Sequence, residues 1–205
     1  MELLIGTTNE GKVKEFRTLL MNFLPDNILI SSLTLYPCIH EISEDGKSFL
    51  ENSIIKAKNI FQQVNKPVLC DDSGLVIDAL DGEPGIYSAR YPSRIFGRDA
   101  SFREAMEYIV QKLTDIPQEQ RTARFVCALA FINSKGILFT AEGTLEGYIA
   151  HNIEGTHGFG YDPIFIPQGY TTSLATLAHE EKNTISHRYN ALNALFAQFS
   201  SDNYI

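Results

Sequence analysis

Cysteine is scarce in this sequence, and no apolar run is long enough to cross a membrane. The three cysteines, Cys38, Cys70 and Cys127, are widely spaced and odd in number, which argues against a disulfide framework and a cysteine-based metal site. A spanning helix needs about 20 apolar residues, whereas the N-terminal segment carries Glu2 and only the short apolar run Leu3–Ile5. We therefore expect no signal peptide, no membrane partner and a cytoplasmic location, where thiols stay reduced.

Positive charge is also in short supply. The 17 lysines and arginines face 25 aspartates and glutamates, so the formal net charge is −8. This balance argues against general binding to nucleic acid, and a polyanionic ligand would need a local group of cations. The length of 205 residues and the 44% hydrophobic content predict one domain, residues 1–205, which is large enough to have two lobes.

The most informative stretch places two acids at the end of a buried strand. Asp71 and Asp72 follow the apolar run Val68–Cys70, and Ser73 comes next, before a second apolar run, Leu75–Leu80. Desolvated carboxylates need a cation nearby, and Mg²⁺ prefers carboxylate oxygens and water. The spacing therefore indicates a magnesium site. The alternative is a simple turn, because Asp, Ser and Gly favour turns.

The first segment of the chain has the features of a phosphate-binding loop. Leu3–Ile5 predicts a strand, and a helix with apolar residues three and four apart begins near Val13. The intervening loop would point backbone N–H groups and the positive end of the helix dipole at an anion. Within this loop, which also contains Glu10 and Gly11, Lys12 adds a full positive charge, and Thr7, Thr8 and Asn9 add neutral donors.

The same loop allows a second interpretation. Gly6, Gly11 and Lys12 have the spacing of a P-loop, which predicts an ATPase or kinase. The next residue is Val13, however, where a P-loop has a serine or threonine that holds Mg²⁺. The phosphate-binding prediction survives this mismatch, whereas the P-loop identity is weakened.

Two polar residues near the next predicted helix are further candidates. Ser48 and Glu51 form a capping box that starts the helix. Glu44, in the loop before it, is a second possible carboxylate for the metal, and Lys56, off the apolar stripe, is a possible phosphate ligand. The commoner alternatives are a solvated loop for Glu44 and a solvated helix face for Lys56.

The middle of the chain predicts a mixed sheet. Residues 125–131 are apolar on both faces, which is typical of a central strand. A hairpin turn at 133–136 then leads to expected strands at 137–141 and 144–150. Strands joined by hairpins are antiparallel, which weighs against the mostly parallel sheet of a P-loop protein.

The last two polar segments suggest a binding site for a flat ring. Phe159 and Tyr161, on a glycine-rich loop, can stack on a base, and Asp162 can accept a hydrogen bond from it. The alternative is that both rings cover the edge of the core. Farther on, Lys182, His187 and Arg188 lie near the start of an expected final helix, where the dipole disfavours cations and an acceptor-rich ligand would favour them.

Taken in order, these motifs resemble the inosine triphosphate pyrophosphatase family, the Ham1/RdgB-like purine nucleoside triphosphate pyrophosphatases. The resemblance covers nearly the whole chain and is weaker over residues 92–120 and the hairpin. At His157, family members commonly have glycine instead. The matching motifs are Thr7-Thr8-Asn9-x-x-Lys12, Phe49-x-Glu51-Asn52-x-x-x-Lys56-Ala57, Asp71-Asp72-Ser73-Gly74-Leu75, Pro84-Gly85-Ile86-Tyr87-Ser88-Ala89-Arg90-Tyr91, Gly158-Phe159-Gly160-Tyr161-Asp162-Pro163-Ile164-Phe165 and Ser186-His187-Arg188.

The resemblance implies an α/β fold, an elongated mixed sheet flanked by helices, with two lobes and a nucleotide cleft between them. It also implies a homodimer that uses Mg²⁺ to hydrolyse ITP, dITP and XTP to the monophosphate and pyrophosphate. Asp72 matches the catalytic proton acceptor, and Asp72 and Glu44 would hold the metal. The loop 7–12, Lys56 and Lys182 would bind the phosphates, and Ser73 would contact the substrate.

The resemblance implies that the remaining residues bind the purine base. Phe159 would stack on the purine, in the loop that contains Gly160 and Tyr161, and Asp162 would accept from the base. His187 and Arg188 would donate to the 6-oxo group, which adenine lacks. Besides the P-loop enzyme, a non-enzymatic sensor of purine nucleotides is a third possibility, although a sensor has no need of the paired acids.

Overall fold

The computed structural model describes residues 2–39 and 42–199 of the chain. The chain separates into two compact units, each with a hydrophobic core of its own. Unit 1 comprises Met1–Asp72, Cys127–Gly143 and His187–Ile205, and unit 2 comprises Ser73–Val126 and Thr144–Ser186. Among the described residues, no helix is long and apolar enough to cross a membrane.

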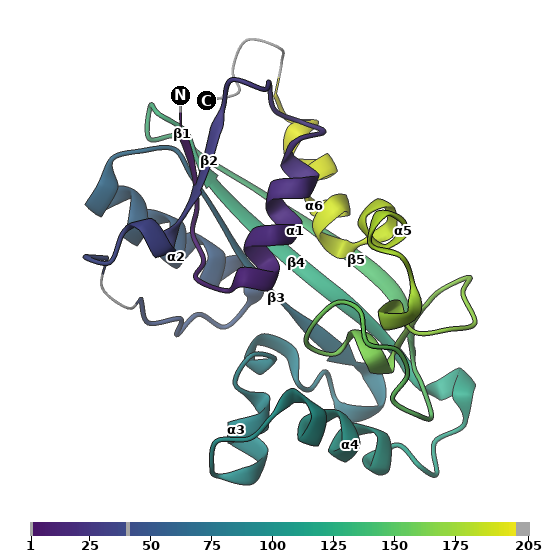
Figure 1. The fold of residues 1–205 in the computed structure, drawn as a ribbon. Coiled ribbons are helices and arrows are strands. Elements are labelled where there is room, and N and C mark those ends of the chain that lie inside the picture. Colours follow the sequence, from purple (N-terminus) through teal and green to yellow (C-terminus); the bar gives the residue numbers. More distant parts are fainter. Residues whose placement is uncertain (1, 40–41, 200–205) are drawn as a thin grey trace. The chain divides into compact units, whose positions relative to one another are not determined.

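The strands form a six-stranded sheet in the order β2-β1-β3-β4-β5-β6 (Figure 1). The first strand pairs in parallel with β2 and β3, whereas β5 and β6 are antiparallel, so the predicted mixed α/β fold is confirmed. The predicted central strand lies between β3 and β5. The strands are β1 (Glu2–Ile5), β2 (Leu29–Ser32), β3 (Val68–Ile77), β4 (Thr122–Ile132), β5 (Leu138–Ile149) and β6 (Phe165–Pro167).

In unit 1, helices pack on both faces of the strands. Leu3 and Ile5 of β1 lie in one hydrophobic cluster with residues of α1 (Glu10–Leu20) and α6 (His187–Phe196), which are neighbours (Figure 1). Leu4, between them in sequence, lies in a second cluster with residues of α2 (Phe49–Val64). This division follows from the alternation of side chains along a strand.

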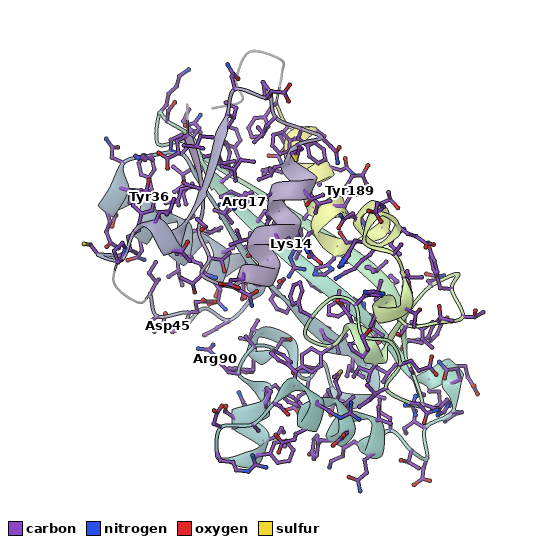
Figure 2. The ribbon with its side chains drawn as sticks, in the orientation of Figure 1. Lys14, Arg17, Tyr36, Asp45, Arg90 and Tyr189 are labelled. Carbon is purple, nitrogen blue, oxygen red and sulfur yellow. The ribbon has the colours of Figure 1, made fainter. Side chains whose placement is uncertain are left out.

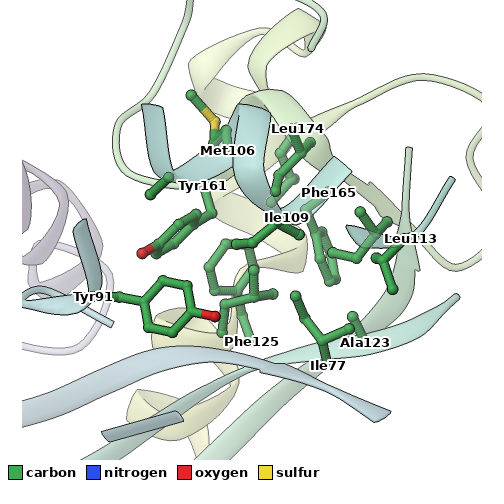
Figure 3. Close-up of a cluster of buried hydrophobic side chains, with 14 of the residues drawn as sticks. Ile77, Tyr91, Met106, Ile109, Leu113, Ala123, Phe125, Tyr161, Phe165 and Leu174 are labelled. Atoms are coloured by element: carbon green, nitrogen blue, oxygen red, sulfur yellow. The ribbon is translucent and has the colours of Figure 1, made fainter. Parts of the chain in front are cut away.

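Unit 2 has a core in which aromatic and aliphatic side chains pack together (Figure 3). Its helices are α3 (Tyr91–Phe96), α4 (Phe102–Lys112) and α5 (His179–Ile185), and Ser101 and Glu104 form a capping box at the start of α4. A fully buried arginine, Arg121, donates to the carbonyl oxygens of Leu113, Ile149 and Ala150. These bonds connect the end of α4 to both β4 and β5.

Three elements differ from the sequence-based expectations. Residues 71–74 do not form a turn: β3 continues through them, and the second expected strand ends at Ile77. Likewise β5 is one strand through Gly143 rather than two. The expected final helix is split into α5 and α6 because Ser186 between them has an extended backbone (φ −64°, ψ 150°). In the first two cases pairing within the sheet outweighs the local preference of Gly, Ser and Asp for turns.

The cysteines of the described chain are all free, but their environments differ. Cys38 is exposed, whereas Cys70 and Cys127 are buried. Burial raises the pKa of both buried thiols. Gly6 approaches Cys70 so closely that an added Cβ would lie 2.2 Å from its Sγ, so the phosphate loop begins directly against this thiol.

Gly143 allows α6 to pack directly on β5. An ideal Cβ at this position would lie 2.2 Å from the backbone nitrogen of Ala191 and 2.5 Å from the carbonyl oxygen of His187. Both atoms belong to the helix backbone and cannot rotate away. This contact fixes the first turn of α6, which carries His187 and Arg188.

We predict that Gly143→Ala destabilises the protein by about 2–3 kcal/mol, because inserting a methyl group into a packed contact forces backbone shifts. The urea midpoint of unfolding measures this loss. Glu142→Ala, at an exposed position of the same strand, is the control and should leave the midpoint nearly unchanged. Equal midpoints for the two variants would show that β5 and α6 are not in close contact.

A polar cluster in unit 1 attaches the start of β1 to the segment after β2. The Lys66 ammonium donates to Glu2 at 2.6 Å and to the Tyr36 hydroxyl at 2.9 Å, and the hydroxyl donates to Glu2 at 2.8 Å. The Lys66 ammonium also lies 5.3 Å from the centre of the Tyr36 ring. The hydrogen bond from Lys66, with a smaller contribution from that of Tyr36, lowers the pKa of Glu2 from 4.5 to about 2.

This lowered pKa predicts a dependence of stability on pH. Because the folded-state pKa lies below the unfolded value, the contribution of Glu2 is fully present above pH 4.5 and disappears as the pH falls toward 2. We expect Glu2→Gln to lose stability at neutral pH but to lose less on acidification than the parent protein does. Urea unfolding at several pH values between about 2 and 7 measures this, with Glu119→Gln, at an exposed position, as the control.

Candidate active site

The phosphate loop ends in a capped helix start. The side chain of Asn9 accepts the backbone N–H of Lys12 at 3.1 Å, and Thr7 Oγ1 accepts the N–H of Asn9 at 3.2 Å. Thr8, Asn9 and Glu10 are exposed. The predicted loop between β1 and α1 is therefore present, with an accessible helix N-terminus of the type that binds anions.

Lys12 leaves this loop toward the buried acids of β3. Its ammonium lies 2.8 Å from Asp71 Oδ2, and the Asp71 side chain is 1% exposed. Burial by itself would raise the pKa of Asp71, but the charges of Lys12, Arg188 and Lys56 outweigh it and lower the pKa to about 2. Asp71 is thus a permanent anion that holds Lys12 at the base of the loop.

Asp72 has a different environment from its neighbour. Its Oδ2 accepts a hydrogen bond at 2.9 Å from the side-chain amide of Asn52, on α2. Burial is the largest influence on Asp72 and raises its pKa, with the nearby charge of Glu44 acting in the same direction. Two adjacent carboxylates therefore have opposite pKa shifts, which is typical of sites where the two have different tasks.

Lys56 lies on the buried face of α2, not on a solvated face. Its ammonium donates to the Asp71 carbonyl oxygen at 2.9 Å and lies 3.1 Å from Glu44 Oε1. Burial acts to lower the pKa of Lys56, but the charges of Asp71 and Glu44 outweigh it, so the pKa is raised. The ammonium stays charged among the acids, as a phosphate ligand requires.

The donor set suits a hard cation. Glu44 and Asp72 are close enough for the charge of one to raise the pKa of the other, which means that a cation beside them would relieve repulsion. No group of three or more His, Cys, Asp or Glu residues arranged to hold a metal occurs among the described residues. Two carboxylates completed by water and substrate phosphates are the usual ligands of Mg²⁺ rather than of zinc.

His187 and Arg188 are buried at the start of α6, 3% and 4% exposed. The Arg188 guanidinium donates to Glu15 on α1 at 2.7 Å, and it lies 5.9 Å from the centre of the Phe16 ring. Glu15 fixes the direction of the guanidinium. Sequence reasoning missed Glu15, because nothing in α1 indicates a partner 173 residues away.

In unit 2, the carboxylate of Asp162 organises the glycine-rich loop. Its Oδ2 accepts from the backbone N–H of Phe159 at 2.9 Å and from the Lys182 ammonium at 2.7 Å. The ammonium also lies 5.1 Å from the centre of the Phe159 ring. At Gly158, with φ +76°, a Cβ would lie 2.0 Å from the same oxygen, so only glycine allows this turn.

Tyr161 is part of the core of unit 2. It is 3% exposed and its hydroxyl donates to the carbonyl oxygen of Ser88 at 3.0 Å. The Ser88 hydroxyl in turn accepts the N–H of Leu75 and donates to the carbonyl oxygen of Gly85. This favours the structural interpretation for the Tyr161 ring and reveals Ser88 as a connector that the sequence did not indicate.

The structure assigns the predicted site residues to two groups. One group, in unit 1, has the loop 7–12, Glu44, Lys56, Asp72, His187 and Arg188. The other, in unit 2, has Ser73, Phe159, Gly160, Tyr161, Asp162 and Lys182. Within unit 1, the contacts join the phosphate loop, the acids and Lys56. That the two groups bind one nucleotide stays a prediction.

Comparison with known proteins gives a consistent result. The family model described as the Ham1 family matches residues 3–198. A dITP/XTP pyrophosphatase of Halalkalibacterium halodurans is 45% identical over 95% of this chain and 96% of its own length. The dITP/XTP pyrophosphatase of Bacillus subtilis is 46% identical over 95% and 94%. The solved structure of a HAM1 protein from Coxiella burnetii superposes with a TM-score of 0.82 at 35% identity, covering 97% and 98%.

The Asp162–Lys182 pair yields a test. We expect Lys182→Met to destabilise unit 2 by about 3 kcal/mol, because it removes the cation from a carboxylate whose side chain is 5% exposed. The backbone N–H of Phe159 donates a hydrogen bond to Asp162, and we expect its hydrogen exchange to become faster in this variant. The double variant Asp162→Asn with Lys182→Met removes both charges and should recover most of the stability. A double variant less stable than the single one would contradict this account.

Proposed function

The chain belongs to the Ham1 family, and we propose that it hydrolyses deaminated purine nucleoside triphosphates, ITP, dITP and XTP, to the monophosphate and pyrophosphate. Such an enzyme removes these nucleotides from the nucleotide pool. The observation that carries this proposal is the buried acid pair with its two lysines, next to the phosphate loop.

Water attacks the α-phosphorus in this proposal, and the bond from that phosphorus to the α,β-bridging oxygen breaks. Asp72 accepts the proton of the water. Its pKa is raised by burial, which makes it a stronger base than an exposed aspartate. Asn52 fixes the orientation of the carboxylate through its hydrogen bond.

Mg²⁺ is proposed as the cofactor, with Glu44 and Asp72 as its protein ligands. It supplies charge neutralisation for the phosphates and makes water easier to deprotonate. Lys12 and Lys56 stabilise the negative charge that develops on the leaving pyrophosphate, and the loop 7–12 orients it with N–H and hydroxyl donors. Asp71 keeps Lys12 in place for this task.

In our proposal, hydrogen-bond donors select purines that have a 6-oxo group. His187 and Arg188 donate to the 6-oxo group of hypoxanthine or xanthine, and Phe159 stacks on the ring. Adenine presents an amino group at that position, so both donors would lose their acceptor. A buried site built for a hydrogen bond rejects a ligand without it strongly.

The homodimer and the cytoplasmic location are also proposals: the first follows from the resemblance of the motifs to this family, and the second from the cysteine usage and the short apolar runs of the sequence. Light scattering on the purified protein measures its molecular mass and thereby tests the homodimer. A monomer mass at micromolar concentration would contradict it.

Identification of the products is the decisive experiment. We expect IMP and pyrophosphate from ITP with Mg²⁺, equivalent products from dITP and XTP, little turnover of ATP or GTP, and no turnover when a chelator removes the metal. IDP with inorganic phosphate, or faster turnover of ATP, would instead support the P-loop enzyme. Tight binding without turnover would support the sensor.

Asp72→Asn tests the proposed base. We expect it to lower kcat for ITP by about 10²–10⁴-fold, the usual contribution of a general base, with little effect on nucleotide binding. Asp45→Asn changes an exposed carboxylate on the loop of Glu44 and serves as the matched control (Figure 2). Unchanged kcat in Asp72→Asn would overturn the assignment.

A further inference from the structure

A pocket of about 550 Å³ opens from the phosphate loop of unit 1, within the range of small-molecule sites. One end is polar and is lined by Gly6, Thr7, Thr8, Glu44 and Lys56. The other end is formed by the segment after β2, which includes the short helix η1 (Leu33–Leu35). The residues that line this end are Leu33, Thr34, Tyr36, Pro37, Ile39 and Ile42.

The two ends suit different chemical groups. The polar end has hydroxyl, backbone and ammonium donors, which suit phosphate oxygens. Among the described residues, the apolar end is lined by an aromatic ring, a proline, three aliphatic side chains and Thr34, and none of these carries a positive charge. Pyrophosphate alone would leave this end without a complementary partner, because placing charged oxygens against apolar surface is unfavourable.

The side chains of the apolar end are held in place by packing and hydrogen bonds. Leu33, Tyr36, Ile39 and Ile42 pack against the hydrophobic cluster of α2 and β3. Glu2 and Lys66 hold the Tyr36 hydroxyl from two sides, and Lys66 also lies near its ring. The ring is thereby fixed in place, as a stacking surface requires (Figure 2).

We propose that this pocket binds a flat ring attached to the terminal phosphate, so that the substrates include dinucleoside triphosphates and other aromatic γ-esters of a deaminated purine nucleotide. This inference rests on the proposed function, which places the leaving phosphates on the loop that borders the pocket. A γ-ester also has fewer negative charges than a free γ-phosphate, which suits the apolar wall.

The reaction itself is unchanged. Water adds to the α-phosphorus, the bond to the α,β-bridging oxygen breaks, and one proton passes to Asp72 and then to solvent. The products are the nucleoside monophosphate and the esterified pyrophosphate, which is a nucleoside diphosphate when the substrate is a dinucleoside triphosphate. No co-reactant other than water is needed.

The experiment compares ITP with two synthetic derivatives, one carrying a phenyl and one a methyl ester on the γ-phosphate. Release of IMP is measured for all three with Mg²⁺. We expect kcat/KM for the phenyl ester to lie within tenfold of the value for ITP and about tenfold above the methyl ester, the size of effect that one stacked ring gives. Equal values for the two esters would overturn the proposal.

Two variants test whether the preference for the phenyl ester arises in this pocket. Tyr36→Ala should lower kcat/KM for the phenyl ester about tenfold and change the values for ITP and the methyl ester less than twofold. Leu35→Ala, at a 69% exposed position of the same segment that does not line the pocket, should change none of them. An equal loss for all three substrates in Tyr36→Ala would assign Tyr36 a structural role only and overturn the proposal. Absence of IMP from ITP itself would instead refute the proposed function.

Discussion

The arrangement of unit 1 depends on keeping two adjacent carboxylates ionisable inside a β-strand. Asp71 and Asp72 are 2% and 7% exposed, and burial of uncompensated anions at this level would be prohibitive. The compensation comes from two elements: Lys12 comes from the phosphate loop, and α2 supplies both Lys56 and the amide of Asn52. The same contacts that make the strand stable therefore assemble the groups that the chemistry needs.

This constraint also explains why the two acids differ. Asp71 has a cation within hydrogen-bonding distance, so its pKa is low and its charge is fixed. Asp72 accepts a hydrogen bond from the neutral amide of Asn52, and burial, the largest influence, raises its pKa. A pair of identical residues at adjacent positions thereby provides one permanent anion and one group able to exchange a proton.

Much of this arrangement was predictable from the sequence, because it follows from local signals. The loop between a short apolar run and an amphipathic helix predicted the phosphate loop, and the strand that is apolar on both faces, with the hairpin after it, predicted the mixed sheet. The continuity of β3 through Asp71–Gly74 was not predictable, because sheet pairing there outweighs turn preference. The burial of Lys56 was not predicted, because periodicity identifies only the apolar residues of α2, whereas Asn52 and Lys56 are buried through contacts with Asp72 and Asp71 of β3. Partners distant in sequence, such as Glu15 for Arg188, give no local signal.

The distribution of the cysteines has a practical consequence. Thiol reagents attack the thiolate, and burial keeps Cys70 and Cys127 protonated and inaccessible. Cys38 is exposed and stands between Pro37 and Ile39, two residues of the pocket wall. A fluorophore or spin label would therefore attach to the natural protein at one position, without mutagenesis. Its signal would follow the occupancy of that wall during turnover.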